Sequence, residues 1–184
     1  VEPATPAAPA AVEPATPAKS ALTGPTLNHI IAAGKIIVGV EPNYPPFEFK
    51  PNLKEIIGFD IDIAKAIAAA IGVKLEFEEL SWEELIPNLS DAKIDIVISG
   101  MTKTPVRATK IDFSDAYFET GQVIVLNRKN RTIKQLTDIN NPKIKIGVQK
   151  GTTGEQAAKD NFPQAIIKPY DDVYLCQTDL INKK

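Results

Sequence analysis

The residues best suited to ligand chemistry surround Arg107, in the stretch SGMTKTPVRATK. Thr104 followed by Pro105 is typical of a helix start, with threonine as the N-cap and proline as the first helical residue. Arg107 then falls in the first turn, where a cation opposes the helix dipole at a cost of about 0.3–1 kcal/mol. An anionic ligand would offset that cost, and the planar guanidinium matches a carboxylate in bidentate fashion. The alternative is a surface ion pair with Asp112 or Asp115, and the spacing alone favours neither.

The residues just before this helix also suit an anion site. Ser99, Gly100 and Thr102 follow the apolar run Ile94–Ile98, which predicts a strand. Ligands of open α/β sheets bind beyond the carboxyl ends of the strands. Gly100 allows the backbone to approach a ligand closely, and the Thr102 hydroxyl with the helix amides can complete an anion site.

These residues must be positioned by the elements before them, which alternate between strand and helix patterns. The apolar spacing predicts a helix, a strand, a helix capped by Asp60, an alternating strand and another helix. A capping box from Ser81 to Glu84 begins the last of these, and Pro87 within it is expected to shorten it. Connections this short predict a parallel sheet with helices on its faces. The ranges are Leu27–Ile31, Ile36–Val40, Ile61–Ala70, Val73–Phe77 and Trp82–Leu89.

The pattern restarts after Tyr117 and predicts a second, shorter α/β unit. Gln122–Leu126 and Ile144–Val148 are each expected to form a strand. Thr152–Glu155 has the spacing of a helix start, and Val173–Ile181 predicts a final amphipathic helix.

Composition excludes several functional classes. The chain has 184 residues and a net charge of −2, so it lacks the basic face of a nucleic-acid-binding protein, and no nucleic-acid partner is expected. No apolar run approaches the ~18 residues of a membrane-spanning helix. The single cysteine, Cys176, cannot form an intrachain disulfide, and the single histidine, His29, lies outside every motif. We expect no metal site, no cofactor and no catalytic residue.

The first residues differ in composition from the rest. VEPATPA occurs at residues 1–7 and again at residues 12–18, and proline and alanine dominate between and around the two copies. Such a stretch has little to bury and favours extended conformations. We expect residues 1–26 to be a disordered tether to a membrane, a cell wall or another domain; the alternative is an end without a role.

A series of short motifs runs in order from about Leu27 to the end of the chain. They are VGVE with YPPFEF, GFDID, Trp82 with LIP, DIVISGMT, Arg107 with IDFS and Tyr117, and GVQKGTT. Each is weak alone, but the series resembles the bacterial extracellular solute-binding proteins of family 3, the receptors of ATP-driven amino-acid importers. The resemblance implies a periplasmic-binding-protein-like α/β fold of two lobes that close around one amino acid. Residues 27–118 would form lobe 1, and residues 119–184 would form lobe 2.

The resemblance also implies roles for residues that match the family's motifs. Arg107 would clamp the α-carboxylate of the ligand, helped by Thr102 and the amides near it. The Thr153 amide would reach the same carboxylate from the second lobe. Backbone atoms of Ser99 and Gly100 would face the α-amino group.

Three further residues would surround the ligand side chain. Tyr44 and Trp82 would pack against it, although Tyr44 could be only a turn residue and Trp82 only core packing. Glu41 stands where family members often place an acidic residue, which favours a polar or basic ligand side chain.

Some family features have no counterpart after the last predicted helix. In the family, that helix precedes a Gly-x-x-Asp-Ala strand, an aspartate that binds the α-amino group, and a return to the first lobe. We therefore expect the second lobe and the return to be incomplete, as in a C-terminally truncated product or a fragment. These 184 residues are then expected to bind a ligand weakly or not at all.

The expected function is that of a binding module. It would capture an amino acid in the periplasm or at the cell surface and deliver it to the membrane permease of an ABC transporter. The alternatives are the ligand-sensing domain of a receptor and, with less support, a dehydratase of the same fold. An enzyme would need positioned titratable groups in the cleft, and only Glu41 is predicted there.

Overall fold

The centre of the fold is a three-stranded parallel sheet, in a computed structural model that describes residues 24–52 and 54–182. Its strands are β1 (Lys35–Val40), β4 (Lys74–Glu79) and β5 (Ile96–Val97), in the order β4-β1-β5. Val38 in β1 aligns with Phe77 on one side and with Ile96 on the other. The predicted parallel sheet is therefore confirmed, with β1 in its middle.

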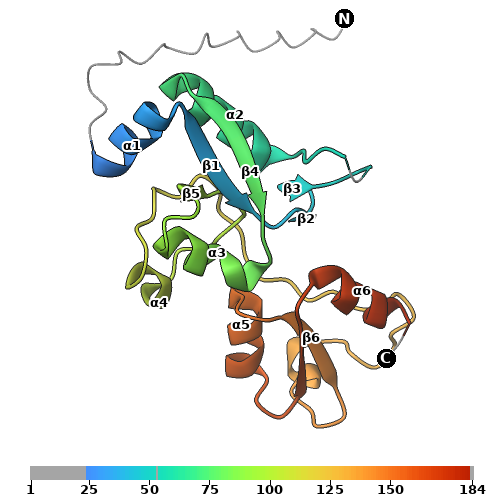
Figure 1. The fold of residues 1–184 in the computed structure, drawn as a ribbon. Coiled ribbons are helices and arrows are strands. Elements are labelled where there is room, and N and C mark those ends of the chain that lie inside the picture. The colour runs from blue at the N-terminus through green and yellow to red at the C-terminus, as the bar shows by residue number, and fades with distance from the viewer. Residues whose placement is uncertain (1–23, 53, 183–184) are drawn as a thin grey trace, which may run out of the picture.

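Helices cover this sheet and bury its apolar side chains. They are α1 (Pro25–Ala33), α2 (Phe59–Ile71), α3 (Trp82–Ser90) and the short α4 (Pro105–Ala108). In α2, Ile61, Ala64 and Ala68 recur every three or four residues, so they share one face. That face packs on Val38 and Val40 of β1, and all five side chains are buried. The carboxyl ends of the strands point toward the second unit of the chain (Figure 1).

A small hairpin lies between β1 and α2. It consists of β2 (Asn43–Tyr44) and β3 (Glu48–Phe49), which pair in antiparallel orientation. Aromatic rings gather on it, since Phe47 stacks on Tyr44 at 5.6 Å and meets Phe118 edge-on at 4.9 Å. The predicted site residue Tyr44 is therefore held in place by aromatic packing on the hairpin.

The second unit is a single strand–helix–strand crossover with one more helix. Its elements are the 3₁₀ helix η2 (Leu136–Ile139), β6 (Lys145–Gln149), α5 (Thr153–Asn161), β7 (Ile166–Tyr170) and α6 (Val173–Ile181). Strands β6 and β7 run parallel, which the α5 crossover requires. At Gly147, an added Cβ would lie only 2.4 Å from the Cys176 sulfur, so a glycine here lets α6 pack closely on β6. This unit lies below the three-stranded sheet in the view of Figure 1.

One predicted strand is wrong. Gln122–Leu126 forms no ladder with any described strand, because β6 and β7 pair only with each other. Its apolar side chains are exposed; Val123 is 82% exposed and Val125 is 69% exposed. A β-rich composition makes a strand possible, but a ladder also needs a neighbouring strand with free backbone groups.

The start of α2 also differs from the prediction. Gly58 is the N-cap, the helix begins at Phe59, and Asp60 lies inside the first turn rather than capping it. Gly58 has φ +135°, and an added Cβ would lie 2.1 Å from the carbonyl oxygen of Phe47. The close approach of the hairpin therefore decides which residue begins the helix.

Other boundaries shift less. Helix α3 continues to Ser90 despite Pro87, whose carbonyl accepts the Asp91 N–H at 2.9 Å, so the predicted shortening does not occur. Strand β5 is shorter than its apolar run, and β7 is not predicted at all because Pro169 interrupts its pattern. Proline is tolerated there since β7 is an edge strand. Residues 1–23 of the predicted tether lie outside the described residues, and α1 already begins at Pro25.

Candidate functional site

The guanidinium of Arg107 lies between two backbone carbonyls. Its Nη1 donates to the Thr102 oxygen at 2.7 Å, and its Nη2 donates to the Gly151 oxygen at 2.9 Å. Thr104 caps α4 as predicted, because its hydroxyl oxygen accepts the Arg107 N–H at 3.2 Å. The side chain is only 9% exposed, and this burial lowers the pKa of Arg107. An arginine nevertheless stays charged at neutral pH.

The surface ion pair considered for Arg107 is not formed. Asp112 and Asp115 are exposed, and the guanidinium donates to carbonyl oxygens instead. Helix α4 has only four residues, so its dipole is a minor influence on the site. Within the described chain, two of the five guanidinium N–H groups are engaged, which leaves donors for a carboxylate.

Trp82 meets Arg107 at the same carbonyl. The indole Nε1 donates to the Gly151 oxygen at 3.0 Å, and the Arg107 Cζ lies 5.2 Å from the centre of the indole ring. A cation over an indole face is attracted by about 0.5–1 kcal/mol when exposed and by more when desolvated. Trp82 is the first residue of α3, held there by the predicted capping box at Ser81. It is therefore part of a polar junction and not only core packing.

Ser99 and Gly100 are held by hydrogen bonds to two acidic side chains, those of Glu48 and Asp60. The Ser99 hydroxyl donates to Glu48 Oε1 at 2.8 Å and accepts the Glu41 N–H at 3.0 Å. The Gly100 N–H donates to Asp60 Oδ2 at 2.7 Å. Gly100 has φ +55°, in the left-handed region that favours glycine, so this turn needs the residue found there.

Glu41 lies at the end of β1 and reaches the second unit. It is 6% exposed, and its Oε1 accepts the Gln149 Nε2–H at 2.7 Å. Burial raises the pKa of Glu41, the Gln149 hydrogen bond opposes the rise, and the charge of Asp172 adds to it. A second bridge lies nearby, where Asn43 Nδ2 donates to Asp172 Oδ2 at 2.7 Å.

The remaining predicted residues lie at the margins of this group. Tyr44 is 50% exposed, and its ring lies 3.6 Å from the position of an added Cβ on Gly100. Thr102 is exposed and contributes its carbonyl to Arg107. Thr153 is the first residue of α5, and its hydroxyl oxygen accepts the Gln122 Nε2–H at 3.0 Å.

The contacts thus place Arg107, Trp82 and Glu41 at the junction of the two units, after β1, β5 and β6 end. The prediction missed Glu48, Asp60 and Tyr117, which lie beneath Ser99 and Gly100. Glu48 and Asp60 occur in motifs already singled out, YPPFEF and GFDID, but Glu48 was given no role and Asp60 was expected only as a helix cap. It also gave Gln149 no role, although Gln149 bonds Glu41 across the junction.

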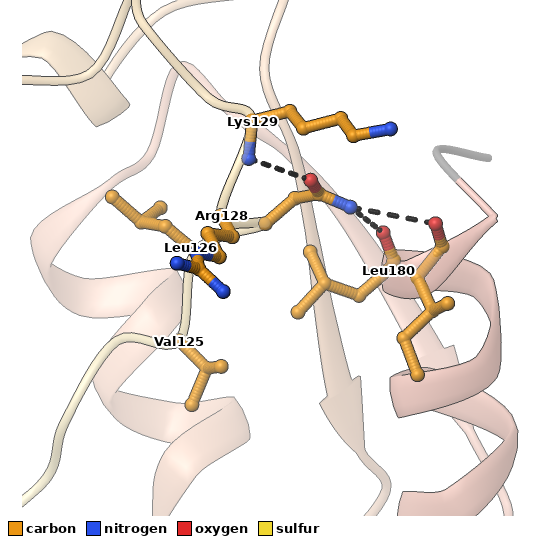
Figure 2. A pocket seen from close by; sticks show the side chains of 7 residues that line it. Val125, Leu126, Arg128, Lys129 and Leu180 are labelled. Atoms are coloured by element: carbon orange, nitrogen blue, oxygen red, sulfur yellow. Dashed lines mark hydrogen bonds between the residues drawn. The ribbon is translucent and has the colours of Figure 1, made fainter.

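Hollows on the described surface lie both at the site and away from it. One of about 430 Å³ borders the site and is lined in part by Trp82, Met101, Arg107, Lys110 and Gly151. The other, of about 440 Å³, lies between residues 125–129 and the end of α6 (Figure 2). None of the predicted site residues lines this second hollow, so it is not the site described here.

Comparison with known proteins accounts for this arrangement. The bacterial extracellular solute-binding proteins, family 3, match this chain over residues 36–174. The chain belongs to this family. The match covers the three-stranded sheet, the Arg107 segment and the second unit up to the start of α6.

Two curated relatives are named as arginine-binding proteins. The chain is 36% identical over 137 residues to the arginine-binding extracellular protein ArtP of Bacillus subtilis, covering 74% of this chain and 52% of the relative. It is 37% identical over 151 residues to the ABC transporter arginine-binding protein 1 of Escherichia coli, covering 82% and 60%. The family 3 chain described here therefore spans about half to three fifths of the length of these curated relatives.

Solved structures of family 3 proteins share the fold. An ancestral amino acid-binding protein, described as a precursor of cyclohexadienyl dehydratase, is 44% identical, with a TM-score of 0.82 over 85% of this chain and 70% of that chain. The holo arginine-binding protein of T. maritima is 36% identical, with a TM-score of 0.79 over 85% and 68%. The α/β, two-lobe fold expected for a family 3 protein is confirmed, and the present chain is a part of it.

Among the residues that the structure describes, no helix is both long enough and apolar enough to cross a membrane. No group of three or more His, Cys, Asp or Glu side chains within residues 24–52 and 54–182 could hold a metal ion.

Proposed function

We propose that this chain carries the site that binds an L-amino acid with a polar or basic side chain, outside the cytoplasm, for delivery to the permease of an ABC importer; by themselves these 184 residues are expected to bind it weakly. The observation that carries the proposal is the buried Arg107 guanidinium, held where the two lobes meet. A buried cation with spare donors is the group expected to bind a carboxylate. The names of the curated relatives support an amino acid as the class of ligand.

The carboxylate end of the ligand would lie against Arg107 and Thr102. Their mutual hydrogen bond would fix the guanidinium plane, and the Thr153 amide at the start of α5 would add a donor from lobe 2. Binding there would strengthen contacts that already join the lobes. A ligand that contacts both lobes favours their closure, and closure is a signal that a permease can recognise.

The side-chain end would lie toward Glu41, Tyr44 and Trp82. Glu41 has a hydrogen-bonding partner in Gln149, and a cationic ligand would supply a second partner of opposite charge. Two aromatic rings can hold the aliphatic part of a long side chain and attract its charged end. This chemistry supports arginine or another basic amino acid, in agreement with the arginine named for two relatives.

The chain contains its own optical probe for the test. Trp82 is the only tryptophan in the sequence, and it contacts both Arg107 and Gly151. We expect its emission to change in a saturable way when L-arginine is added, in a titration that extends to millimolar ligand so that weak binding is also detected. Agmatine, which has the arginine side chain without the carboxylate, is the matched ligand control and should bind far more weakly.

The outcomes separate the parts of the proposal. Equal binding of arginine and agmatine would contradict a carboxylate clamp at Arg107. A response to glutamine but not to arginine would keep the amino-acid site and overturn the basic preference. No response to arginine, histidine, glutamine or cystine, by fluorescence or by amide NMR shifts near Gly100, would overturn the binding function.

The receptor and enzyme alternatives have different signatures. A transmembrane segment encoded beside the lobes would favour a sensor domain over an importer subunit. One structural neighbour is described as a precursor of cyclohexadienyl dehydratase, but that neighbour is itself an amino acid-binding protein. Release of water from a cyclohexadienyl substrate by this chain would overturn the assignment as a binding protein.

A further inference from the structure

Two carboxyl groups are buried together beneath the site. Glu48 in β3 is 1% exposed, and Asp60 in the first turn of α2 is 0% exposed. In each carboxyl group one oxygen accepts hydrogen bonds: Ser99 donates to Glu48 Oε1, and Gly100 and Tyr117 both donate to Asp60 Oδ2. The other oxygens, Glu48 Oε2 and Asp60 Oδ1, are buried without a hydrogen-bond donor in the described chain.

One proton shared by the two carboxyl groups would supply the missing hydrogen-bond donor and remove one of the two charges. Two buried carboxylates repel each other, and a buried acceptor without a donor is destabilising. Glu48 and Asp60 accept hydrogen bonds from the consecutive residues Ser99 and Gly100, so both carboxyl groups lie at the same turn. A proton on Glu48 would supply a donor to Asp60 and would leave one negative charge on the pair instead of two.

The pair is connected to the predicted ligand contacts on both sides. Glu48 holds the Ser99 hydroxyl, which in turn accepts the backbone N–H of Glu41. Asp60 accepts the backbone N–H of Gly100. The left-handed conformation of Gly100 turns the chain away from β5. A change of charge at the pair therefore acts directly on the turn that would face the ligand's amino group.

We propose that Glu48 and Asp60 share one proton and act as positioning residues that hold the Ser99–Gly100 turn in its binding geometry. The role in binding rests on the function proposed above, whereas the shared proton does not. Deprotonation would place two charges under the turn, displace the Gly100 amide and weaken amino-acid binding.

The electrostatic surroundings agree with this geometry. Burial raises the pKa of Glu48 to about 8; the Ser99 hydrogen bond opposes the rise, and the charges of Asp60 and Glu41 add to it. Burial also raises the pKa of Tyr117, with Asp60 and Glu48 adding to the rise, so this phenol remains a donor throughout the range of interest. The groups around the Glu48 carboxyl are thus Asp60, Glu41, Ser99 and Tyr117, and they favour retention of one proton at neutral pH.

The first experiment requires no amino acid. Carboxyl ¹³C and amide ¹⁵N shifts of the isotopically labelled chain are followed from acid to alkaline pH. We expect the Glu48 carboxyl to titrate near pH 8 and the Gly100 amide to follow the same midpoint. Glu48→Gln should abolish the pH-dependent change in the Gly100 amide shift. The shift should stay near its wild-type value at neutral pH, because the side-chain NH₂ of the glutamine can donate in place of the proton. Glu78→Gln, at an exposed position of β4, is the matched control and should leave the step unchanged.

The second experiment measures L-arginine binding in parallel in the wild type and Glu48→Gln. If only the protonated pair binds, the wild-type affinity falls about tenfold one pH unit above the midpoint, relative to Glu48→Gln at the same pH. This ratio cancels titration of the ligand's own amino group. Asp60→Asn provides a second variant, in which the Glu48 midpoint should fall because the neighbouring charge is gone.

Each outcome bears on one step. An ordinary acidic midpoint for Glu48 would overturn the shared proton. The positioning role would be overturned if the Gly100 amide shift did not change with the Glu48 midpoint. It would also be overturned if the wild type and Glu48→Gln kept equal affinities for L-arginine at alkaline pH. Failure of arginine to bind at neutral pH would count against the proposed function and would leave the NMR titration as an independent result.

Discussion

Arg107 Nη2 lies 2.9 Å from the carbonyl oxygen of Gly151, and this contact joins the segment after β5 to the segment after β6. The same oxygen accepts the indole N–H of Trp82 at 3.0 Å. The bonds from Glu41 to Gln149 and from Asn43 to Asp172 cross the same junction. The lobes are therefore joined by polar contacts that a ligand carboxylate could reinforce, and the predictions below test the parts of this arrangement.

Replacement of Arg107 by lysine tests the clamp. Lysine keeps the charge but cannot span two acceptors as the planar guanidinium does. Since a hydrogen bond to a charged group is worth about 1.5–3 kcal/mol, Arg107→Lys should weaken L-arginine binding by at least about tenfold. The change is measured by titration of Trp82 fluorescence. Arg128→Lys, at an exposed position near the second hollow, should bind as the wild type does; equal loss in both variants would contradict the clamp.

Gly58→Ala tests the close approach of the hairpin to α2. The new Cβ would lie 2.1 Å from the Phe47 carbonyl oxygen at a residue with φ +135°, so backbone must move. Overpacking and backbone strain together predict a loss of about 2–5 kcal/mol in the free energy of unfolding. Urea denaturation followed by circular dichroism measures it. Gly121→Ala has nothing within 4 Å and should stay close to the wild type, so similar stabilities of the two variants would be the contrary result.

Ser81→Ala tests the capping box that holds α3 and Trp82. Loss of an N-cap side chain costs about 1 kcal/mol of the free energy of unfolding. Hydrogen bonds from the Ser81 side chain and then from its backbone lower the pKa of Glu84. A lowered pKa in the folded state means stability that is present above about pH 4.5 and is lost as the pH falls through the folded value.

The measurement for this cap is urea unfolding at neutral and at acidic pH. The difference between Ser81→Ala and the wild type should shrink on acidification. Ser90→Ala removes a hydroxyl from the exposed last residue of the same helix and serves as the control. A difference that stays constant down to the acidic end would show that the cap acts without the Glu84 charge.

The stability of the chain should also report on Glu48 at higher pH. A carboxyl whose pKa rises from 4.5 to about 8 on folding binds more protons in the folded state between these values. Its contribution is complete below about pH 4.5 and is lost as the pH rises through about 8. Glu48→Gln should therefore flatten the fall in unfolding free energy between about pH 4.5 and about pH 8. A slope that persists unchanged in this variant would assign the loss to another group.

Much of the local structure could be predicted from the sequence because its causes are local. The helical spacing over α2, the capping box at Ser81 and the Thr104-Pro105 helix start depend on residues a few positions apart. The order of short motifs also identified the family, since the match covers residues 36–174. The placement of Arg107 and Ser99 beyond the strand ends followed from the parallel sheet.

The partners of these residues were decided only by the tertiary structure. Arg107 and Gly151 are 44 residues apart, and Gln149 lies 108 residues from Glu41. No local period encodes such contacts, because they depend on how the two units meet. Asp60 likewise became a buried acceptor for Gly100 rather than a helix cap, since the approach of Phe47 moved the cap to Gly58.

The sequence alone therefore determined most of the helices, the parallel sheet of the first unit and the chemistry that collects near the strand ends. The tertiary structure decided which charges are buried, which donors meet them, and that Gln122–Leu126 stays unpaired. The physical reason is the range of the interactions: helix caps and apolar periods act over one or two turns, whereas burial and hydrogen-bond partners arise only when distant segments pack together.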